Sequence, residues 1–549
     1  MPSARRDPET GGLTFHRLGL AAAGLFYLAA IIHVLFLGKG RGALDPDVTE
    51  LVLAHWQLED GYREGFEEMI RLFEEMKREQ GARVKVVQTT VPWRGYRQWM
   101  MTQLISSNPA DVLEIQGSAS VRYQYFTPLS PYAGKPNPFN AGTPLEGMAW
   151  KDTFLDGMEG AFDRVYAEYF GVGNFFHNSR LHVNVDLVEK ATGTRALPTD
   201  LTEWMETCRK IEEYAERIGE PISPIGVRGF DRGTLNMLFR TYYSQLNGHL
   251  NDDLSRFCDG EAAPVDILRG LKDGTVDRER LSAVSGIVQE IGQHFVKGFT
   301  AVDLEQSKYL FYTGKVAFFP EGSWNSYSLV KNCPFEVAII RIPPVGHKHR
   351  YSKYFTGKIT ESGVRIWGAF GIPKACRNFD LALELLQFMT SYEINQMTMD
   401  YCKWPPAVKK AKFEGILKAF QPDLEGNLNV AHPFYVGWRS TSHRKISEAL
   451  EEIIMERAAD PGRRLLEKFA EQKDVIVEEL EEAVVSYQRT GLELEAQRSQ
   501  MAMGLLRGDL GPAERRRLAL RGTLAREAFA EGVKGNLLNR LHLKEMRNF

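Results

Sequence analysis

The sequence predicts an α/β protein with two lobes, an N-terminal transmembrane helix and a C-terminal helical extension. Strand-like apolar segments alternate with amphipathic helical segments in two separate runs, a pattern that favours sheets covered by helices. The chain of 549 residues is too long for one ordinary hydrophobic core, so more than one domain is expected. An uncharged apolar segment precedes both runs, and charged helical sequence follows them.

The composition is typical of a folded globular protein. Apolar residues make up 43% of the chain and charged residues 25%, and the formal net charge is −3. The net charge is not strongly positive, so the composition does not indicate a nucleic-acid partner. The cysteines lie far apart, without the CxxC or Cys/His spacing of a zinc site, and we expect them to be buried small apolar side chains. They are Cys208, Cys258, Cys333, Cys376 and Cys402.

Residues 18–37 carry no charge, and a helix of this length spans a hydrocarbon core of about 30 Å. Arg5, Arg6 and Arg17 precede the segment, which favours a cytoplasmic N terminus and an extracytoplasmic body, although two basic residues follow it. A cleaved signal peptide is the alternative. Its apolar region is usually shorter and ends at a small-x-small site, whereas LGKGRGA follows here, so we favour an uncleaved anchor. No cysteine directly follows the segment, which excludes a lipoprotein attachment there.

The first run predicts a parallel sheet with aromatic and polar side chains at its strand ends. Ligands of such sheets bind beyond the carboxyl ends of the strands, and Trp56 and Gln116 fall at such ends. The expected strands are 50–56, 82–91 and 110–116, and the expected helices are 61–79 and the segment that carries Tyr96, Trp99 and Leu104.

The second run begins near Val183 and contains a clear helix start. Asp200 is expected to cap a helix, and Glu203 is expected to complete a capping box. The segment FYTGKVAFFPEGSW predicts a strand between two turns and then a helix from Asn325. Further strands are expected at 335–344 and 363–373, and a further helix at 380–399.

The last part, from about Pro461, is charged and helical in pattern. Beyond Tyr487 the apolar stripe weakens and basic residues outnumber acidic ones, including Arg515, Arg516 and Arg517. This tail is either a solvated helix pair or a docking element for a partner or for anionic headgroups. We expect the body to fold without it.

Six pieces of residues 48–483 resemble, in order, the family 1 extracellular solute-binding proteins, the maltose-binding-protein-like group that feeds ABC importers. The most specific are LFYTGKVAFFPEGSW, which resembles F-x-x-GKxAM-x-x-GSW, and GAFGIPKACRNFDLALELLQFMTSYEINQ, which resembles the family's crossing strand and following helix. The others are LVLAHW with GARVKVVQ, YRQWMMTQL with NPADVLEI, HNSRLHVNVDLVEKATG, and LPTDLTEWMETCRKI. Two departures stand out: the usual Gly-Gly before the crossing strand is absent around Gly363, and Phe318 replaces the usual Met.

The resemblance implies the type II periplasmic-binding-protein fold, in which two lobes close like a Venus flytrap. We expect three crossings between the lobes, near residues 170, 368 and 404. The expected parts are 1–40 as cytoplasmic stub and anchor, 48–170 with 369–403 as lobe 1, 171–368 with 404–483 as lobe 2, and 484–549 as basic tail.

The resemblance also implies a ligand site. Trp324, with Glu321 and Ser323, resembles the family's binding turn on lobe 2, and Trp438 resembles a second aromatic platform. Aromatic faces suit the apolar side of a sugar ring, and planar polar groups suit its hydroxyls. On lobe 1 the strand-end candidates are Trp56, Glu59, Trp93, Gln116 and Ser118. Trp367 suits either the ligand wall or hinge packing, and a core position is the alternative for Trp324.

The resulting hypothesis is a membrane-tethered extracytoplasmic protein that captures a small solute, favoured as a sugar or oligosaccharide, and delivers it to an ABC permease. A sensing module of a membrane complex and a carbohydrate-active enzyme are the alternatives. The sequence has no GxSxG, HExxH, GxxxxGK[ST] or strand-linked GxGxxG motif, so no catalysis is expected. No cofactor or metal is expected either, including at His347 and His349.

Overall fold

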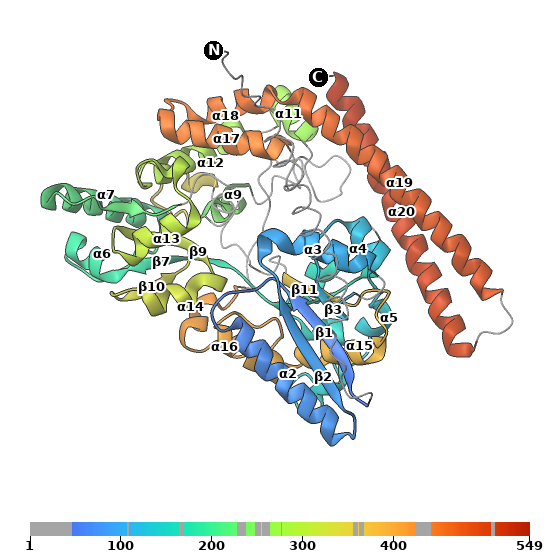
Figure 1. Ribbon diagram of the computed structural model, residues 1–549. Helices are drawn as coiled ribbons and strands as arrows, with labels where there is room; N and C mark the ends of the chain where they lie inside the picture. The colour runs from blue at the N-terminus through green and yellow to red at the C-terminus, as the bar shows by residue number, and fades with distance from the viewer. Residues whose placement is uncertain are drawn as a thin grey trace, which may run out of the picture. The chain divides into compact units, whose positions relative to one another are not determined.

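The structure is a computed structural model that describes a large part of the chain (Figure 1). The predicted transmembrane segment 18–37 lies outside the described residues. Within the described ranges, no helix is long and apolar enough to cross a membrane. The described residues are 47–106, 109–163, 166, 168–227, 238–247, 254, 264–275, 277–354, 361, 367–423, 441–506 and 511–548.

Strands and helices alternate along most of the body, as the sequence predicts. The strands are β1 (Thr49–His55), β2 (Val84–Thr90), β3 (Val112–Glu114), β4 (Phe162–Asp163), β5 (Glu168–Tyr169), β6 (Val172–Phe175), β7 (Ser179–Asn184), β8 (Ser223–Ile225), β9 (Val316–Gly322), β10 (Val337–Ile340) and β11 (Trp367–Gly371). The helices up to α9 are α2 (Tyr62–Glu79), α3 (Trp93–Ile105), α4 (Ala119–Tyr125), α5 (Ser130–Ala133), α6 (Val185–Thr192), α7 (Leu201–Ile218) and α9 (Arg240–Asn247). The later helices are α11 (Pro264–Asp273), α12 (Arg278–Gly292), α13 (Leu304–Tyr312), α14 (Ser323–Asn332), α15 (Phe379–Met389), α16 (Tyr392–Cys402), α17 (Thr441–Glu456), α18 (Pro461–Ala470), α19 (Lys473–Leu505) and α20 (Pro512–Asn548).

The chain divides into two compact units of very different size. Of the described residues, the smaller contains 47–51 and Glu74–Val87, and the larger contains Val52–Phe73 and those from Gln88 onward. Within the smaller unit, Glu74 accepts a hydrogen bond from the Val86 amide at 2.8 Å and pairs with Lys85 at 3.3 Å. These contacts hold the end of α2 beside β2.

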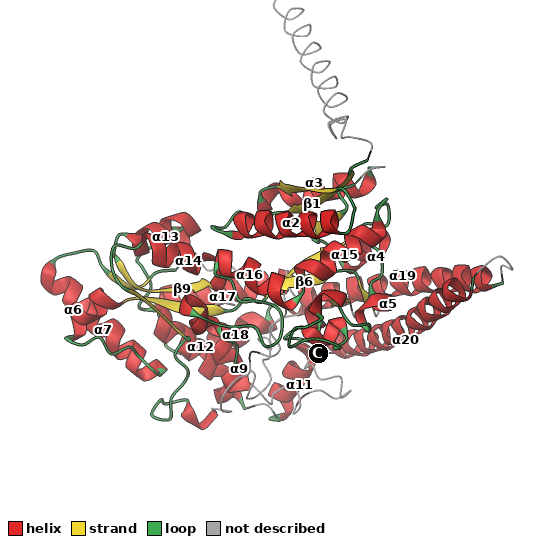
Figure 2. Ribbon diagram, turned by 90° about the horizontal axis from the view of Figure 1, so that it is seen from below, coloured by secondary structure: helices red, strands yellow, loops and turns green. Residues whose placement is uncertain are grey.

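Two larger sheets define the two lobes. The first lobe is built on a sheet with strand order β2-β1-β3-β11-β6, in which β1 and β3 are parallel and β11 runs antiparallel to both of its neighbours. The second lobe is built on the order β10-β7-β9-β8, with β7 antiparallel to β9 and β8 parallel to β9. Figure 2 shows helices around the strands of the second lobe.

Apolar side chains from strands and helices fill the second lobe. Trp204 of α7 is fully buried, and its ring meets Phe318 of β9 edge-on with 5.9 Å between centroids. Phe318, which stands where the resembled sequence pattern has Met, is therefore a packing residue of the second lobe. At the start of α7, the Asp200 carboxylate accepts from the Glu203 amide at 3.0 Å, while Glu203 accepts from the Thr199 amide at 2.9 Å. The predicted cap is confirmed, with the return bond one residue earlier than in a standard capping box.

The expected boundary at residue 170 falls before the end of the first sheet. β6 still belongs to this sheet, pairing with β11, and β7 begins the second sheet. The carbonyl of Asn174 in β6 accepts from the Asn395 side chain at 2.7 Å, which ties β6 to α16 of the first lobe. Residues 172–175 therefore belong with the first lobe.

Two of the expected helices have different bounds. The helix expected at 380–399 is two helices, because Thr390 and Ser391 turn their hydroxyls back onto main-chain carbonyls of the preceding turn at 2.7 and 2.8 Å. Amides in the first turn of a helix have no acceptor within the helix, and the Tyr392 amide at the start of α16 donates to the Asn140 side chain at 2.8 Å. The helix expected from Asn325 begins earlier, at Ser323.

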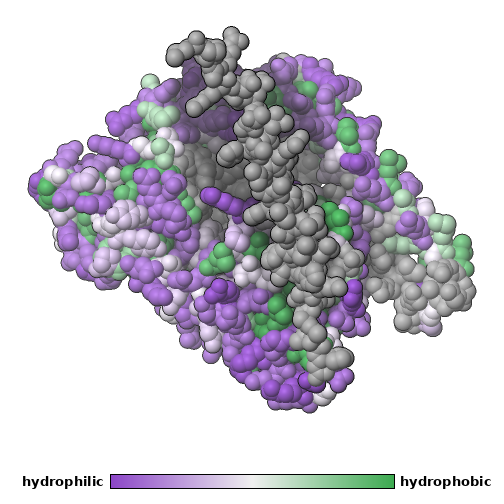
Figure 3. Space-filling view, viewed as in Figure 1, coloured by the Kyte–Doolittle hydropathy of each residue, from purple (hydrophilic) through white to green (hydrophobic). Residues whose placement is uncertain are grey.

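The C-terminal tail is helical as predicted, but its residues take part in the cores of the lobes. α19 and α20 lie side by side as a hairpin in both ribbon views (Figures 1 and 2). Leu494 of α19 is buried in the first-lobe cluster, and Met546 of α20 is buried in the second-lobe cluster. Isolated apolar positions on these charged helices therefore fill space in the body, and a body that folds without the tail stays a prediction from the sequence. The face in Figure 3 is mostly hydrophilic, with small apolar groups between.

Candidate ligand-binding site

Trp56 directly follows β1 and forms an aromatic group with α3. Its ring lies 5.2 Å from that of Trp93 and 5.0 Å from that of Tyr96, edge-on in both cases. The Tyr96 hydroxyl donates to the Ala54 carbonyl at 3.1 Å, which fixes this group at the end of β1. Trp93 is 54% exposed and Trp56 is half-buried. The structure thus brings these two predicted residues together and leaves aromatic surface in contact with solvent.

Glu114 ends β3 beside this aromatic group and was not predicted from the sequence. It is fully buried, and its carboxylate accepts from the Gln57 side chain at 2.7 Å and from the Trp56 amide at 3.3 Å. Burial raises the pKa of Glu114 well above its usual value, and these two hydrogen bonds oppose the rise only in part. A single acidic residue inside the otherwise apolar run VLEI was the available signal.

Gln116 and Ser118 follow β3, as predicted. The main-chain amide of Gln116 donates to the Met100 sulfur at 3.4 Å. Its side-chain Nε2 is buried and has no hydrogen-bond partner among the described residues, which is costly unless another group accepts from it. Ser118 is exposed and precedes the first turn of α4.

Glu59 lies in the turn between β1 and α2. Its carboxylate accepts from the Leu58 amide at 2.9 Å. Burial raises the pKa of Glu59, while main-chain hydrogen bonds and the charge of Lys308 oppose the rise. Lys308 belongs to α13 of the second lobe, so its field reaches a predicted site residue of the first.

The turn from β9 into α14 is built around a close contact between Trp324 and Gly322. A Cβ atom at Gly322 would lie 2.2 Å from the Trp324 ring, so only glycine allows the indole to lie against the main chain here. The Trp324 ring also meets His177 edge-on at 5.3 Å and is half-buried. The indole is therefore held in place without being enclosed.

Ser323 and Glu321 flank this glycine. The Ser323 amide donates to the Asn178 carbonyl at 3.0 Å, and the side-chain oxygen of Ser323 is buried without a hydrogen-bond partner among the described residues. Glu321 is buried, lies opposite Arg180 in the β7–β9 ladder, and accepts from the Gly322 amide at 2.7 Å. Glu321 thus stabilises the turn from within.

Trp404 connects this turn to the first lobe. Its indole nitrogen donates to the Trp324 carbonyl at 3.2 Å, and its ring lies 4.8 Å from Tyr62 and 4.6 Å from Phe175. Trp404 was not among the site residues predicted from the sequence. Of the other candidates, Trp367 lies in β11 opposite Phe175, with its side chain outside the description, and Trp438 lies outside the described residues.

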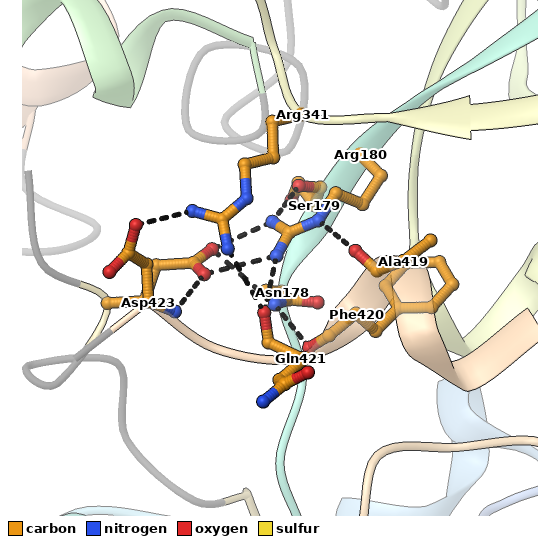
Figure 4. A network of polar contacts seen from close by, with 9 residues as sticks. Asn178, Ser179, Arg180, Arg341, Ala419, Phe420, Gln421 and Asp423 are labelled. Carbon is orange, nitrogen blue, oxygen red and sulfur yellow. Dashed lines mark hydrogen bonds and ion pairs between the residues drawn. The ribbon is translucent and has the colours of Figure 1, made fainter. Parts of the chain in front are cut away.

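A network of polar contacts, part of it buried, joins β7 to the segment around residues 419–423 (Figure 4). Arg180 of β7 is buried, pairs with Glu361 at 2.7 Å and donates to the Ala419 carbonyl at 2.7 Å. Glu361 also accepts from the Asp423 amide at 2.9 Å, and Asp423 pairs with Arg341 at 2.8 Å. Burial opposes ionisation of Glu361, but the charge of Arg180 and these hydrogen bonds bring its pKa below the usual value.

No group of three or more His, Cys, Asp or Glu residues in the described ranges could hold a metal ion. The aromatic group at the end of β1 and the turn from β9 into α14 carry groups that suit reversible, non-covalent binding. These groups are aromatic faces, buried amide and hydroxyl groups, and a buried carboxyl.

Comparison with known proteins identifies the family and the fold of the chain. The sequence pattern of the bacterial extracellular solute-binding proteins matches residues 56–396. None of the curated proteins compared with the chain matches it. Among solved structures, apo RafE from Streptococcus pneumoniae is similar with a TM-score of 0.53 and 17% identity, covering 78% of this chain and 97% of RafE.

Two further structures share the fold. The GacH receptor of Streptomyces glaucescens, studied unliganded and with acarbose, has a TM-score of 0.51 and 13% identity over 79% of this chain and 99% of its own. Lmo0181 from Listeria monocytogenes, an ABC substrate-binding protein in complex with cycloalternan, has a TM-score of 0.50 and 14% identity over 78% of this chain and 99% of its own. Because the family pattern matches residues 56–396, more than half of the chain, the chain belongs to the bacterial extracellular solute-binding protein family.

Proposed function

We propose that this protein captures a small extracytoplasmic solute, a sugar or oligosaccharide, between its two lobes and delivers it to an ABC-type permease. Membership of the extracellular solute-binding family supports solute capture outside the cytoplasm. The sugars named for the similar structures, cycloalternan and acarbose, support a carbohydrate as the first ligand class to test. A ligand that touches both lobes binds the closed form better and shifts the population toward it, which gives a permease a signal to recognise.

The observation that carries the proposal is the pairing of aromatic surface with unsatisfied polar atoms on each lobe. On the first lobe, Trp56 and Trp93 accompany the side-chain nitrogen of Gln116, which no described residue pairs with. On the second, Trp324 accompanies the hydroxyl of Ser323, which likewise has no partner within the described part of the chain. Buried polar groups without partners cost about 1–3 kcal/mol each, so hydroxyl groups of a ligand would offset a penalty already present in the fold.

We assign the site to the turn residues of both lobes. Glu59 and Ser118 add polar groups on the first lobe and Glu321 supports the second, while Trp367 and Trp438 remain predictions from the sequence alone. Glu114 and Gln57 are positioning residues, because their contacts fix the main chain at Trp56.

Residues 18–37 would tether the body to the membrane on its extracytoplasmic side. An uncleaved anchor predicts a mature protein that begins near Met1 and resists extraction from membranes by high salt. Amino-terminal sequencing that starts near Ala43 would replace this tether with a cleaved signal peptide and leave the binding function as proposed.

A thermal-shift screen tests the function. Sugars, oligosaccharides, polyols, polyamines and thiamine are added singly to the full chain in detergent. A ligand present at about 100 times its dissociation constant stabilises the folded state by about 2.7 kcal/mol, which is a clear shift in the melting temperature. Stabilisation by one carbohydrate class supports the proposal. Turnover of that carbohydrate would indicate an enzyme instead, and stabilisation by a non-carbohydrate alone would overturn the ligand class.

A further inference from the structure

The C-terminal hairpin reaches the cores of both lobes. Ile476 and Leu480 of α19 and Met546 of α20 are buried in the second-lobe cluster. Arg269 of α11 adds an ion pair with Glu545 at 3.8 Å. At this end the hairpin is part of the hydrophobic core of the second lobe.

Farther along, the same hairpin is anchored on the first lobe. Leu494 is 1% exposed and belongs to the cluster that contains Tyr166 and Phe170, against which Phe529 of α20 also packs. The Tyr166 hydroxyl donates to the Glu493 carboxylate at 3.1 Å. Both ribbon views place the hairpin beside α4 of this lobe (Figures 1 and 2).

The two helices of the hairpin are packed closely enough to act as one body. A Cβ atom at Gly535 of α20 would lie 2.9 Å from the Tyr487 ring of α19, and one at Gly491 would lie 3.7 Å from Phe529. Between Leu480 and Leu494, α19 is continuous and rises about 21 Å. This stretch of α19 is buried in the second lobe at Leu480 and in the first lobe at Leu494, so a rigid helix here resists rotation of one lobe against the other.

We propose that the α19–α20 hairpin is a strap that joins the two lobes and restricts their relative rotation, and that lobe motion requires release of the Leu494 anchor. The first-lobe end is the one to release, because it rests on fewer buried side chains than the second-lobe end. The proposal concerns the lobes themselves and stands whether or not the ligand is a carbohydrate.

The test measures the distance between the lobes in the full chain without ligand. Spin labels are placed at Gln98 of α3 and Lys190 of α6, both exposed, with Cys258, Cys333 and Cys376 replaced by Ser. Leu494→Asp places a charge in the first-lobe anchor. Leu492→Asp is the matched control, since Leu492 lies on the same helix and is 73% exposed.

We expect Leu494→Asp to broaden the distribution of inter-lobe distances and shift its mean. Leu492→Asp should show the same distribution as the parent protein. Hydrogen exchange of α19 beyond Tyr487 should rise at least about tenfold in the first variant alone. Should Leu494→Asp fail to fold, Leu494→Ala replaces it, with a smaller change in the same direction. A parental distance distribution in a folded Leu494 variant whose hairpin exchanges rapidly would overturn the strap. A hairpin that stays protected in that variant would overturn the assignment of Leu494 as its anchor.

Discussion

The indole nitrogen of Trp404 donates a hydrogen bond to the main-chain carbonyl of Trp324 at 3.2 Å. Trp404 is itself packed against Tyr62 of the first lobe, so one side chain joins the turn from β9 into α14 to the core of the first lobe. The position of Trp324 thus depends on a residue at the crossing between the lobes.

Replacing Trp404 by Phe removes this donor and part of the ring contact. We expect a loss of about 1–3 kcal/mol in the free energy of unfolding and a weaker affinity for the solute, because the turn loses its support. Trp150→Phe is the control: Trp150 is also buried and donates to Thr390 at 3.0 Å, but it lies within the first lobe. Urea unfolding and calorimetry should show lost stability in both variants and lost affinity in Trp404→Phe alone. Equal affinities would separate Trp404 from the site.

Gly322→Ala tests the contact that places the Trp324 indole. The new methyl group would overlap the ring, so we expect the indole to move, with a strain of about 1–3 kcal/mol and reduced ligand affinity. Gly95→Ala is the matched change, because the space around Gly95 in α3 is open and alanine favours a helix by about 1 kcal/mol. Tryptophan fluorescence and ligand titration follow both variants. Unchanged affinity in a folded Gly322→Ala protein would contradict the proposed placement.

The buried carboxyl of Glu114 predicts a pH dependence of stability. Its pKa is raised in the folded state, so the folded protein binds more protons than the unfolded chain above pH about 4.5, and stability falls as pH rises toward the folded pKa. Glu114→Gln removes this titration and keeps an acceptor for Gln57. Denaturation from about pH 5 to pH 8 should therefore show the parent losing stability relative to Glu114→Gln as pH rises. The exposed Glu64→Gln should follow the parent, and parallel curves for Glu114→Gln and the parent would show that Glu114 does not titrate as expected.

Arg180→Ala tests the network of Figure 4. It leaves Glu361 with a charge and no close cation from β7, and breaking a buried pair in this way costs about 3–5 kcal/mol. Arg195→Ala removes an arginine that contacts three carboxylates at the surface, where water screens the charges, so its melting temperature should change little. Equal melting temperatures for the two variants would show that the network adds no stability.

Local sequence signals predicted many of the strands and helices and the turn from β9 into α14. The capping pair at Asp200 and the turn at Gly322 depend on neighbours within a few residues, which a sequence displays directly. Glu114 and Trp404 were missed because their partners lie 57 and 80 residues away. Leu494 was missed for a related reason: a single apolar residue on a charged helix carries no periodic signal, although it fills a gap in a distant core.

The most direct test of the account is the affinity of Trp324→Ala for the solute found by the thermal-shift screen. Loss of a stacking contact of about 1–3 kcal/mol predicts an affinity about tenfold to a hundredfold weaker, with a ligand-free melting temperature close to that of the parent. Trp204→Ala is the comparison, since that ring is fully buried in the second lobe and its loss should cost about 3–5 kcal/mol of stability. A Trp324→Ala protein that melts many degrees lower without ligand, and whose folded fraction binds the solute normally, would place Trp324 in the core and contradict the proposed site.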